Sequence, residues 1–205
     1  MAQEIGLAPA SAAKESAGTQ GSKTMRHWIG AGAALAPLVL ALAAVIVLAD
    51  GDDSDVNHAC AALHPTVGNK TNGEVHFEQV GKEVKITGRL TGLSPGRHGL
   101  HVHMFGDCTA PDASSAGEHF NPTHADHGGP RDPNRHNGDL GNIEAGRDGV
   151  ANFTMTDSTI SLLGANSIIG RAIIVHAKED DLKSQPAGET GANLACGVVG
   201  IGKPK

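Results

Sequence analysis

Apolar and polar positions alternate along two neighbouring segments of the chain. The alternation runs through residues 74–80 and resumes at 83–90, with Gly81 and Lys82 between the two runs. A period of two places successive side chains on opposite faces of a strand, and a two-residue break containing glycine is typical of a hairpin turn. The pattern therefore predicts an antiparallel β-hairpin.

Further short strands follow, separated by turns and by two long loops. Strand character begins near His58, and later strands are predicted at 98–105, 139–144, 150–156, 171–176 and 194–200. Residues 106–138 are dominated by Pro, Gly, Asp and Asn, and residues 185–192 belong to a second long loop. Loops of such length in a compact domain usually carry function. About eight strands and no convincing soluble helix predict an all-β antiparallel barrel or sandwich over residues 58–205.

Composition agrees with short strands and excludes one class of partner. The chain has 28 Gly and 2% aromatic residues, so its core must be aliphatic and its turns frequent. Beyond residue 49 it carries 13 basic and 20 acidic residues, a net charge of −7. No basic stripe stands out in that part, so nucleic acid is not an expected partner.

An apolar segment precedes the predicted barrel. Residues 28–49 contain no charged residue. A segment of this length can cross a bilayer as a helix. Basic residues precede the segment and acidic ones follow it, so the positive-inside rule places the barrel outside the cytoplasm. We favour an uncleaved transmembrane anchor, with cleavage near Ala49 as the alternative. Residues 1–27 are predicted to be a disordered tail, and residues 50–57 an acidic linker.

Histidines are concentrated in one part of the chain. Of 12 in total, seven fall between His98 and His136. His101 and His103 are two apart on a predicted strand, so both imidazoles lie on one face and can meet one ion. His176 ends another apolar strand, where a buried histidine with a backbone hydrogen bond is the competing explanation. The clustering makes metal binding the first hypothesis.

A second set of candidate ligands lies on the long loop and at its exit. Three imidazoles and one carboxylate form a closed tetrahedral set for zinc, from His119, His127, His136 and Asp139. A loop this polar cannot fold by hydrophobic burial, and a metal would order it. Spacing alone leaves a solvated histidine-rich loop as the alternative.

These motifs, taken in order, resemble those of the copper/zinc superoxide dismutases. The resemblance spans residues 59–203 and is carried by the segments 98–107, 115–122, 127–130, 136–142, 168–171, 175–176 and 194–200. It implies an eight-stranded Greek-key barrel with two long functional loops. Cys108 directly follows Gly106 and Asp107, which is similar to the bacterial branch of the family.

The resemblance also implies the metal ligands and the reaction. One copper ion per chain would be held by His101, His103, His119 and His176, and one zinc ion by His119, His127, His136 and Asp139. His119 would then serve both metals, one through each ring nitrogen, and deliver a proton as copper alternates between two oxidation states. Asp180 matches the carboxylate that links a copper ligand to a zinc ligand. Superoxide would be converted to dioxygen and hydrogen peroxide.

Three cysteines lie in the part expected to be exported. An oxidising compartment favours a disulfide with one thiol left over. The resemblance implies that Cys108 pairs with Cys196, which would tie the long loop to the last strand. Cys60 is then expected to be a buried free thiol, because it lies too far beyond the apolar segment to carry a lipid.

One position departs from the family pattern. The family places an arginine beside the copper channel, three residues before the second disulfide cysteine, and this chain has Asn193 there. Because that cation attracts superoxide, we expect a slower dismutase that anions inhibit weakly. His119 and Asn193 are therefore the positions expected to set the catalytic rate.

Two other functions and two assemblies remain as alternatives. A copper-storing or copper-delivering domain is disfavoured because all four copper ligands are present and a Cys-x-x-Cys module is absent. A catalytically dead envelope protein gains some weight from Asn193, but both ligand sets are complete. Members of the family occur as homodimers and as monomers, so the resemblance leaves a homodimer open. The expected location is periplasmic or extracellular.

Overall fold

The computed structural model describes residues 56–204. The predicted tail 1–27, the apolar segment 28–49 and most of the linker 50–57 lie outside the described residues, so their structure is not tested. Within the described part, the model contains no helix of the length and apolarity needed to span a membrane.

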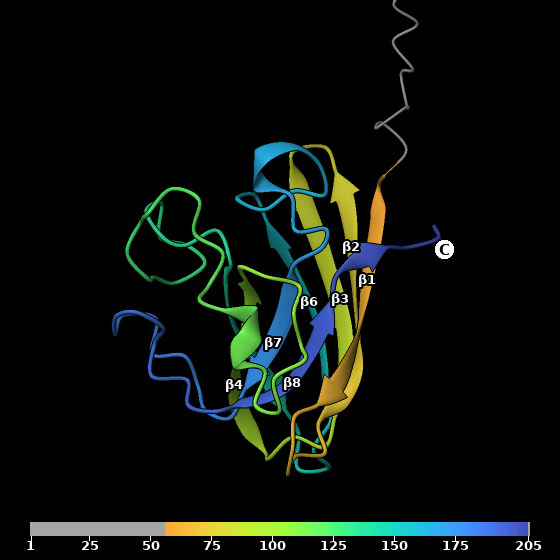
Figure 1. Ribbon diagram of the computed structural model, residues 1–205, viewed down its shortest axis with the longest axis vertical. Coiled ribbons are helices and arrows are strands. Elements are labelled where there is room, and N and C mark those ends of the chain that lie inside the picture. The colour runs from red at the N-terminus through yellow and green to blue at the C-terminus, as the bar shows by residue number, and fades with distance from the viewer. Residues whose placement is uncertain (1–55, 205) are drawn as a thin grey trace, which may run out of the picture. The chain divides into compact units, whose positions relative to one another are not determined.

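Nine strands form one antiparallel sheet that curls into a barrel (Figure 1). They are β1 (His58–Pro65), β2 (Asn72–Val80), β3 (Glu83–Thr91), β4 (Gly96–His103), β5 (Asp139–Ala145), β6 (Ala151–Asp157), β7 (Ala172–His176), β8 (Asn193–Val198) and β9 (Gly200–Ile201). The strand order is β5-β4-β7-β8-β1-β2-β3-β6, with β9 paired to β1. This arrangement confirms the predicted all-β antiparallel fold.

The alternating pattern of the sequence becomes the inside and outside of the barrel. Val75 and Phe77 of β2 are buried, as are Val84 and Ile86 of β3, while the residues between them are more exposed. Phe77 and Ile86 are also register partners across the hairpin, which joins β2 to β3 through the turn at 81–82. The predicted hairpin is confirmed, and its apolar face forms part of one core with the other strands.

Two predicted strands end differently in the structure. The strand predicted over 98–105 ends at His103, because Met104 and Phe105 donate backbone hydrogen bonds to the following loop, at Glu118 and Ala116. The strand predicted over 194–200 is split into β8 and β9. The backbone of Val199 forms hydrogen bonds with residues just before β7. The residues after it form β9, which pairs with β1.

Cys60 is free, as expected, but the expectation that it is buried is wrong. Its side chain is only partly buried, because it alternates along β1 with Ala59 and Ala61, whose side chains fill the core. Cys60 therefore lies on the outer face, opposite His76 of β2.

The two long loops leave the barrel on the same side (Figure 1). The first spans residues 104–138, coloured green, and the second spans residues 177–192, coloured blue. A disulfide joins Cys108 of the first loop to Cys196 of β8. The loops cover the outer face of β4, and for this reason both faces of its last six residues are buried. This covered face carries the candidate site.

Candidate metal centre

Strands and loops bring eight polar side chains into one buried region. β4 supplies two of them, β7 one, the start of β5 one, the first loop three and the second loop one: His101, His103, His176, Asp139, His119, His127, His136 and Asp180. All eight are buried. Polar groups buried in such number need partners to be stable, and the arrangement of the partners shows what the region can do.

The first loop is fixed to β4 by backbone contacts. An isolated antiparallel bridge pairs His103 with His119. Next to it, the backbone N–H of Phe120 donates to Val102, that of Val102 donates to Gly138, and that of Gly138 donates to Phe120. A side chain at Gly138 would collide with the carbonyl oxygen of Val102, so only glycine permits this close approach. The contacts carry the first loop across the outer face of β4 and place its histidines beside His101.

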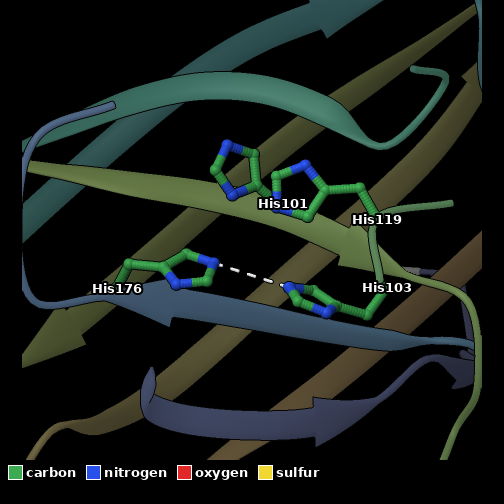
Figure 2. Close-up of side chains that lie close together, drawn as sticks. All are labelled: His101, His103, His119 and His176. Atoms are coloured by element: carbon green, nitrogen blue, oxygen red, sulfur yellow. Dashed lines mark hydrogen bonds between the residues drawn. The ribbon is translucent and has the colours of Figure 1, made fainter. Parts of the chain in front are cut away.

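Four imidazoles form the first ligand set. Each offers one nitrogen, and these atoms lie within 4.8 Å of one another in His101, His103, His119 and His176. Figure 2 shows the rings of His101 and His119 next to each other, with their centroids 4.0 Å apart, and Nε2 of His103 facing Nε2 of His176 at 3.5 Å. Nδ1 of His101 and Nε2 of His119 are buried without a hydrogen-bond partner. A metal ion would supply the partner that these nitrogens lack.

The second ligand set converges on one carboxylate oxygen. Oδ1 of Asp139 lies 2.8 Å from Nδ1 of His119 and 3.0 Å from Nδ1 of His127. Nδ1 of His136 lies 3.2 Å from the same oxygen. Ligand bonds of about 2.0–2.2 Å separate the corners of a zinc tetrahedron by roughly 3.3–3.6 Å, so only small movements would admit the ion. The residues of both sets therefore fit the metals that the sequence implies.

His119 belongs to both sets. Its Nδ1 faces Asp139 in the second set, and its Nε2 faces the first. His101, His103 and His127 reach only one set because the second nitrogen of each ring bonds elsewhere. For example, Nδ1 of His103 donates to the carbonyl oxygen of Gly117 at 2.8 Å, which leaves Nε2 for the centre.

Asp180 connects the two sets from behind. Its Oδ2 accepts a hydrogen bond from Nε2 of His101 at 2.8 Å, and its Oδ1 accepts one from Nε2 of His127 at 2.9 Å. These hydrogen bonds hold a proton on Nε2 of each ring, so Nδ1 is the nitrogen that faces a metal set. One carboxylate fixes the tautomer and the orientation of a ring in each set.

Burial keeps three rings of the first set neutral, those of His103, His119 and His176. It lowers the pKa of His103 to about 4 and, with the neighbouring His101, lowers the pKa of His119 to about 3. Burial and the same neighbours hold the pKa of His176 well below its usual value. Neutral imidazole is the form that binds metals, so these rings are ready ligands at neutral pH.

Carboxylates dominate the second set. Burial alone would lower the pKa of His127, but hydrogen bonds to Asp139 and Asp180 outweigh it and raise the pKa to about 9. Burial alone would raise the pKa of Asp139, but the imidazoles of His119, His127 and His136 hold it far below the usual range. Asp139 is therefore ionised in the second set and stabilises a proton on His127, which a divalent cation would displace on binding.

Several supporting residues were not identified from the sequence. Asn142 of β5 donates through Nδ2 to the backbone oxygen of Asp180 and accepts from its N–H, at 2.9 and 2.7 Å. Gln185 of the second loop likewise bonds to both the N–H and the carbonyl oxygen of His127. Arg135 donates to the carbonyl oxygens of His136 and Asp139. Only Asn142 lies within a segment that carries the family resemblance.

Asn193 lies at the start of β8 beside a cavity of about 340 Å³. The cavity reaches both ligand sets, because His103, His119 and His176 line it together with Asn193 and His136. The side-chain amide of Asn193 donates to the carbonyl oxygen of Asp112 at 3.0 Å. The structure thus places this position on the route to the first set.

Known proteins with the same features identify the family. Residues 71–199 match the family described as copper/zinc superoxide dismutase (SODC). The chain belongs to this family. This chain is 48% identical over 152 residues to the extracellular superoxide dismutase [Cu-Zn] of Brugia pahangi. The match covers 70% of this chain and 75% of that relative.

A solved structure has a similar fold. The crystal structure of the clock protein EA4 matches with a TM-score of 0.66 and 42% identity, over 71% of this chain and 94% of that one. As a copper/zinc superoxide dismutase, the chain is an enzyme that converts superoxide to dioxygen and hydrogen peroxide, with copper and zinc as its cofactors. The predicted family, activity and cofactors are confirmed. The bacterial-type detail, read from the position of Cys108, stays a prediction.

Proposed function

We propose that each residue of the two ligand sets has the role that the sequence predicts. The copper ligands are His101, His103, His119 and His176, and the zinc ligands are His119, His127, His136 and Asp139. The observation that carries this assignment is the position of His119, which directs one ring nitrogen to each set. All-imidazole ligands suit copper, while a set with a carboxylate and no open position suits structural zinc.

The residues around the copper set would bind the metal, orient the rings that hold it and supply a proton. Bound copper supplies a centre that accepts one electron from superoxide and returns it to a second superoxide. Asp180 holds His101 in the tautomer that binds through Nδ1, and the carbonyl of Gly117 holds His103 in the one that binds through Nε2. His119 takes up a proton at Nε2 and passes it to the reduced oxygen, while its Nδ1 stays directed at the zinc set.

The activity is proposed to be lower than a channel with a cation would allow. Asn193 lines the cavity in the position where the family pattern has an arginine, and its amide is neutral. Attraction of a charged substrate into a channel raises association rates about 10- to 1,000-fold, and that gain is missing here.

The location is proposed to be extracytoplasmic, with the chain held at a membrane by residues 28–49 or released after cleavage near Ala49. Support comes from the uncharged segment with its flanking charges and from the disulfide between Cys108 and Cys196, which persists in oxidising compartments. The similar enzyme of Brugia pahangi is described as extracellular. Periplasmic and extracellular placements both satisfy these observations.

A homodimer is proposed through an exposed apolar patch, which we define as Phe105, Val198 and Ile201. Their exposed fractions are 59%, 44% and 67%. Gly106 lies against Val198, so Phe105 is next to β8, and Ile201 follows on β9. Large exposed apolar side chains grouped in this way are typical of protein interfaces.

The ligand assignment is tested by metal analysis combined with a superoxide assay on the full-length chain. The native protein is expected to hold one copper and one zinc, and His119→Ala is expected to lose activity and weaken both sites. His64→Ala changes an exposed histidine outside both sets and should alter neither property. Loss of one metal alone in the His119 variant would contradict a shared ring.

A further inference from the structure

The cavity that leads to the copper set carries one permanent charge. Among the described residues that line it, Glu118 is the only one with a charged side chain at neutral pH, since the others are histidines and uncharged residues. Glu118 is exposed, whereas the ligands beneath it are buried. An anion that enters the cavity therefore passes a carboxylate at its mouth.

Backbone contacts fix Glu118 next to the shared imidazole. It precedes His119 in the sequence, and its carbonyl oxygen accepts a hydrogen bond from the N–H of Met104 at 2.8 Å. The carbonyl of its other neighbour, Gly117, accepts the hydrogen bond from His103. The main chain on both sides of Glu118 is thus held by the site itself, so its backbone position next to the copper set is fixed.

No cation in the lining offsets this charge. Asn193 is neutral and bonds to a backbone oxygen. Lys178 lies beside Gly191, which lines the cavity, but Lys178 is not part of the lining. The part of the chain beyond residue 49 also carries a net charge of −7. The local and the overall fields therefore act on an approaching anion in the same direction.

We infer that Glu118 makes the copper cavity discriminate against anions and in favour of neutral ligands. This inference rests on the proposed function, because it assumes copper in the first ligand set. A unit charge about 8–10 Å from a bound anion changes the dissociation constant of that anion by roughly two- to fivefold when the low-dielectric walls of a cavity strengthen its field. Salt screens a repulsion, so anion binding to this enzyme strengthens as ionic strength rises, opposite to a channel lined by a cation.

The test compares two small copper ligands, azide as the anion and imidazole as the neutral ligand. Each is titrated into the copper- and zinc-loaded full-length protein, and its dissociation constant is read from the visible absorption of copper at low and at high salt. Glu118→Gln is expected to bind azide about two- to fivefold more tightly at low salt and to bind imidazole as the native protein does. Glu83→Gln removes the same charge at the start of β3, outside the cavity lining, and is expected to change neither constant.

The outcomes separate this inference from the assignment beneath it. Equal azide binding by the native protein and Glu118→Gln at low salt overturns the inference, provided that copper is bound and superoxide is consumed. An equal gain in Glu83→Gln also overturns it, because overall charge alone would then explain the effect. A chain that fails to bind copper in the native form contradicts the ligand assignment itself.

Discussion

The carboxylate of Asp180 lies 2.9 Å from Nε2 of His127, on the side of the ring that faces away from the zinc set. Its second oxygen holds His101 of the copper set in the same way, at 2.8 Å. Neither oxygen is shared with a proposed metal. The residue therefore acts on both metals only through the orientation of their ligands.

Asp180→Asn should weaken zinc binding by about 10- to 100-fold, because an amide cannot accept hydrogen bonds from both rings. The zinc dissociation constant, measured by competition with a chelator, checks this expectation. Asp181→Asn is the matched control, since Asp181 is exposed in the same loop and its side chain bonds only to residues 183 and 184. A zinc affinity unchanged in Asp180→Asn would show that Asp180 is not needed to orient His127.

Arg135 and Asp157 form a buried ion pair that joins the first loop to the end of β6. Arg135 also donates to the backbone of the zinc segment, so the pair supports the position of His136 and Asp139. Asp157→Asn should lower the free energy of unfolding by about 3–5 kcal/mol, because it leaves a buried cation unpaired. Urea unfolding followed by circular dichroism measures the change.

The surface pair of Lys85 and Glu78 provides the contrast. Its atoms are 3.7 Å apart and both side chains are more than 40% exposed. Glu78→Gln should cost less than about 1 kcal/mol, since water and salt screen an exposed pair. Similar losses in the two variants would mean that the Arg135–Asp157 pair contributes no more than a surface contact.

Gln185 and Asn142, which the sequence failed to reveal, have partners that are distant along the chain. His101 and His103 could be grouped because two residues on a strand share a face, and the hairpin of β2 and β3 followed from alternation alone. Gln185 bonds to His127 across 58 positions, and Asn142 bonds to Asp180 across 38. Asn and Gln side chains in polar loops have no periodicity, so only the packed fold shows which backbone they meet.

The same limit explains the strand ends. Local propensity continues β4 through Phe105, but the bridge between His103 and His119 directs the chain toward the first loop instead. Cys60 was misplaced for a related reason. The side chain of Cys60 faces outward because Ala59 and Ala61 occupy the inner positions of β1. In a strand of small apolar residues, the sequence alone does not reveal which face is the inner one.

The disulfide between Cys108 and Cys196 closes a loop of 88 positions. Closing a loop of this length removes entropy from the unfolded chain that is equivalent to about 4–5 kcal/mol. Cys108→Ser should lower the free energy of unfolding by up to this amount. Cys60→Ser, which removes the free thiol on the outer face, should leave it within about 0.5 kcal/mol. Equal midpoints of urea unfolding for the native protein and Cys108→Ser would contradict the expectation.

Asn193→Arg should raise kcat/KM for superoxide by about tenfold or more at low ionic strength, because it places a cation in the lining of the cavity. The gain should shrink as salt is added, since the Debye length falls to about 8 Å at physiological ionic strength. Pulse radiolysis at several salt concentrations measures both effects. Asn72→Arg adds the same charge on exposed β2 and should have little effect. No gain in Asn193→Arg would show that this position does not limit the rate.

The apolar patch of Phe105, Val198 and Ile201 predicts the assembly of the enzyme. Ile201→Lys would place a charge where the partner's apolar surface is expected, and burying an unpaired ammonium costs more than the contact gains. Sedimentation velocity should therefore show a dimer for the native full-length chain and a monomer for this variant.

Val80→Lys tests whether any exposed apolar residue would give the same result. Val80 is 55% exposed at the end of β2, outside the patch, so this variant should remain a dimer. A native chain that sediments as a monomer would contradict the dimer directly. If Val80→Lys dissociated the dimer and Ile201→Lys did not, the interface would lie on the β2–β3 side of the barrel, and Phe105 and Val198 would face solvent in the assembly.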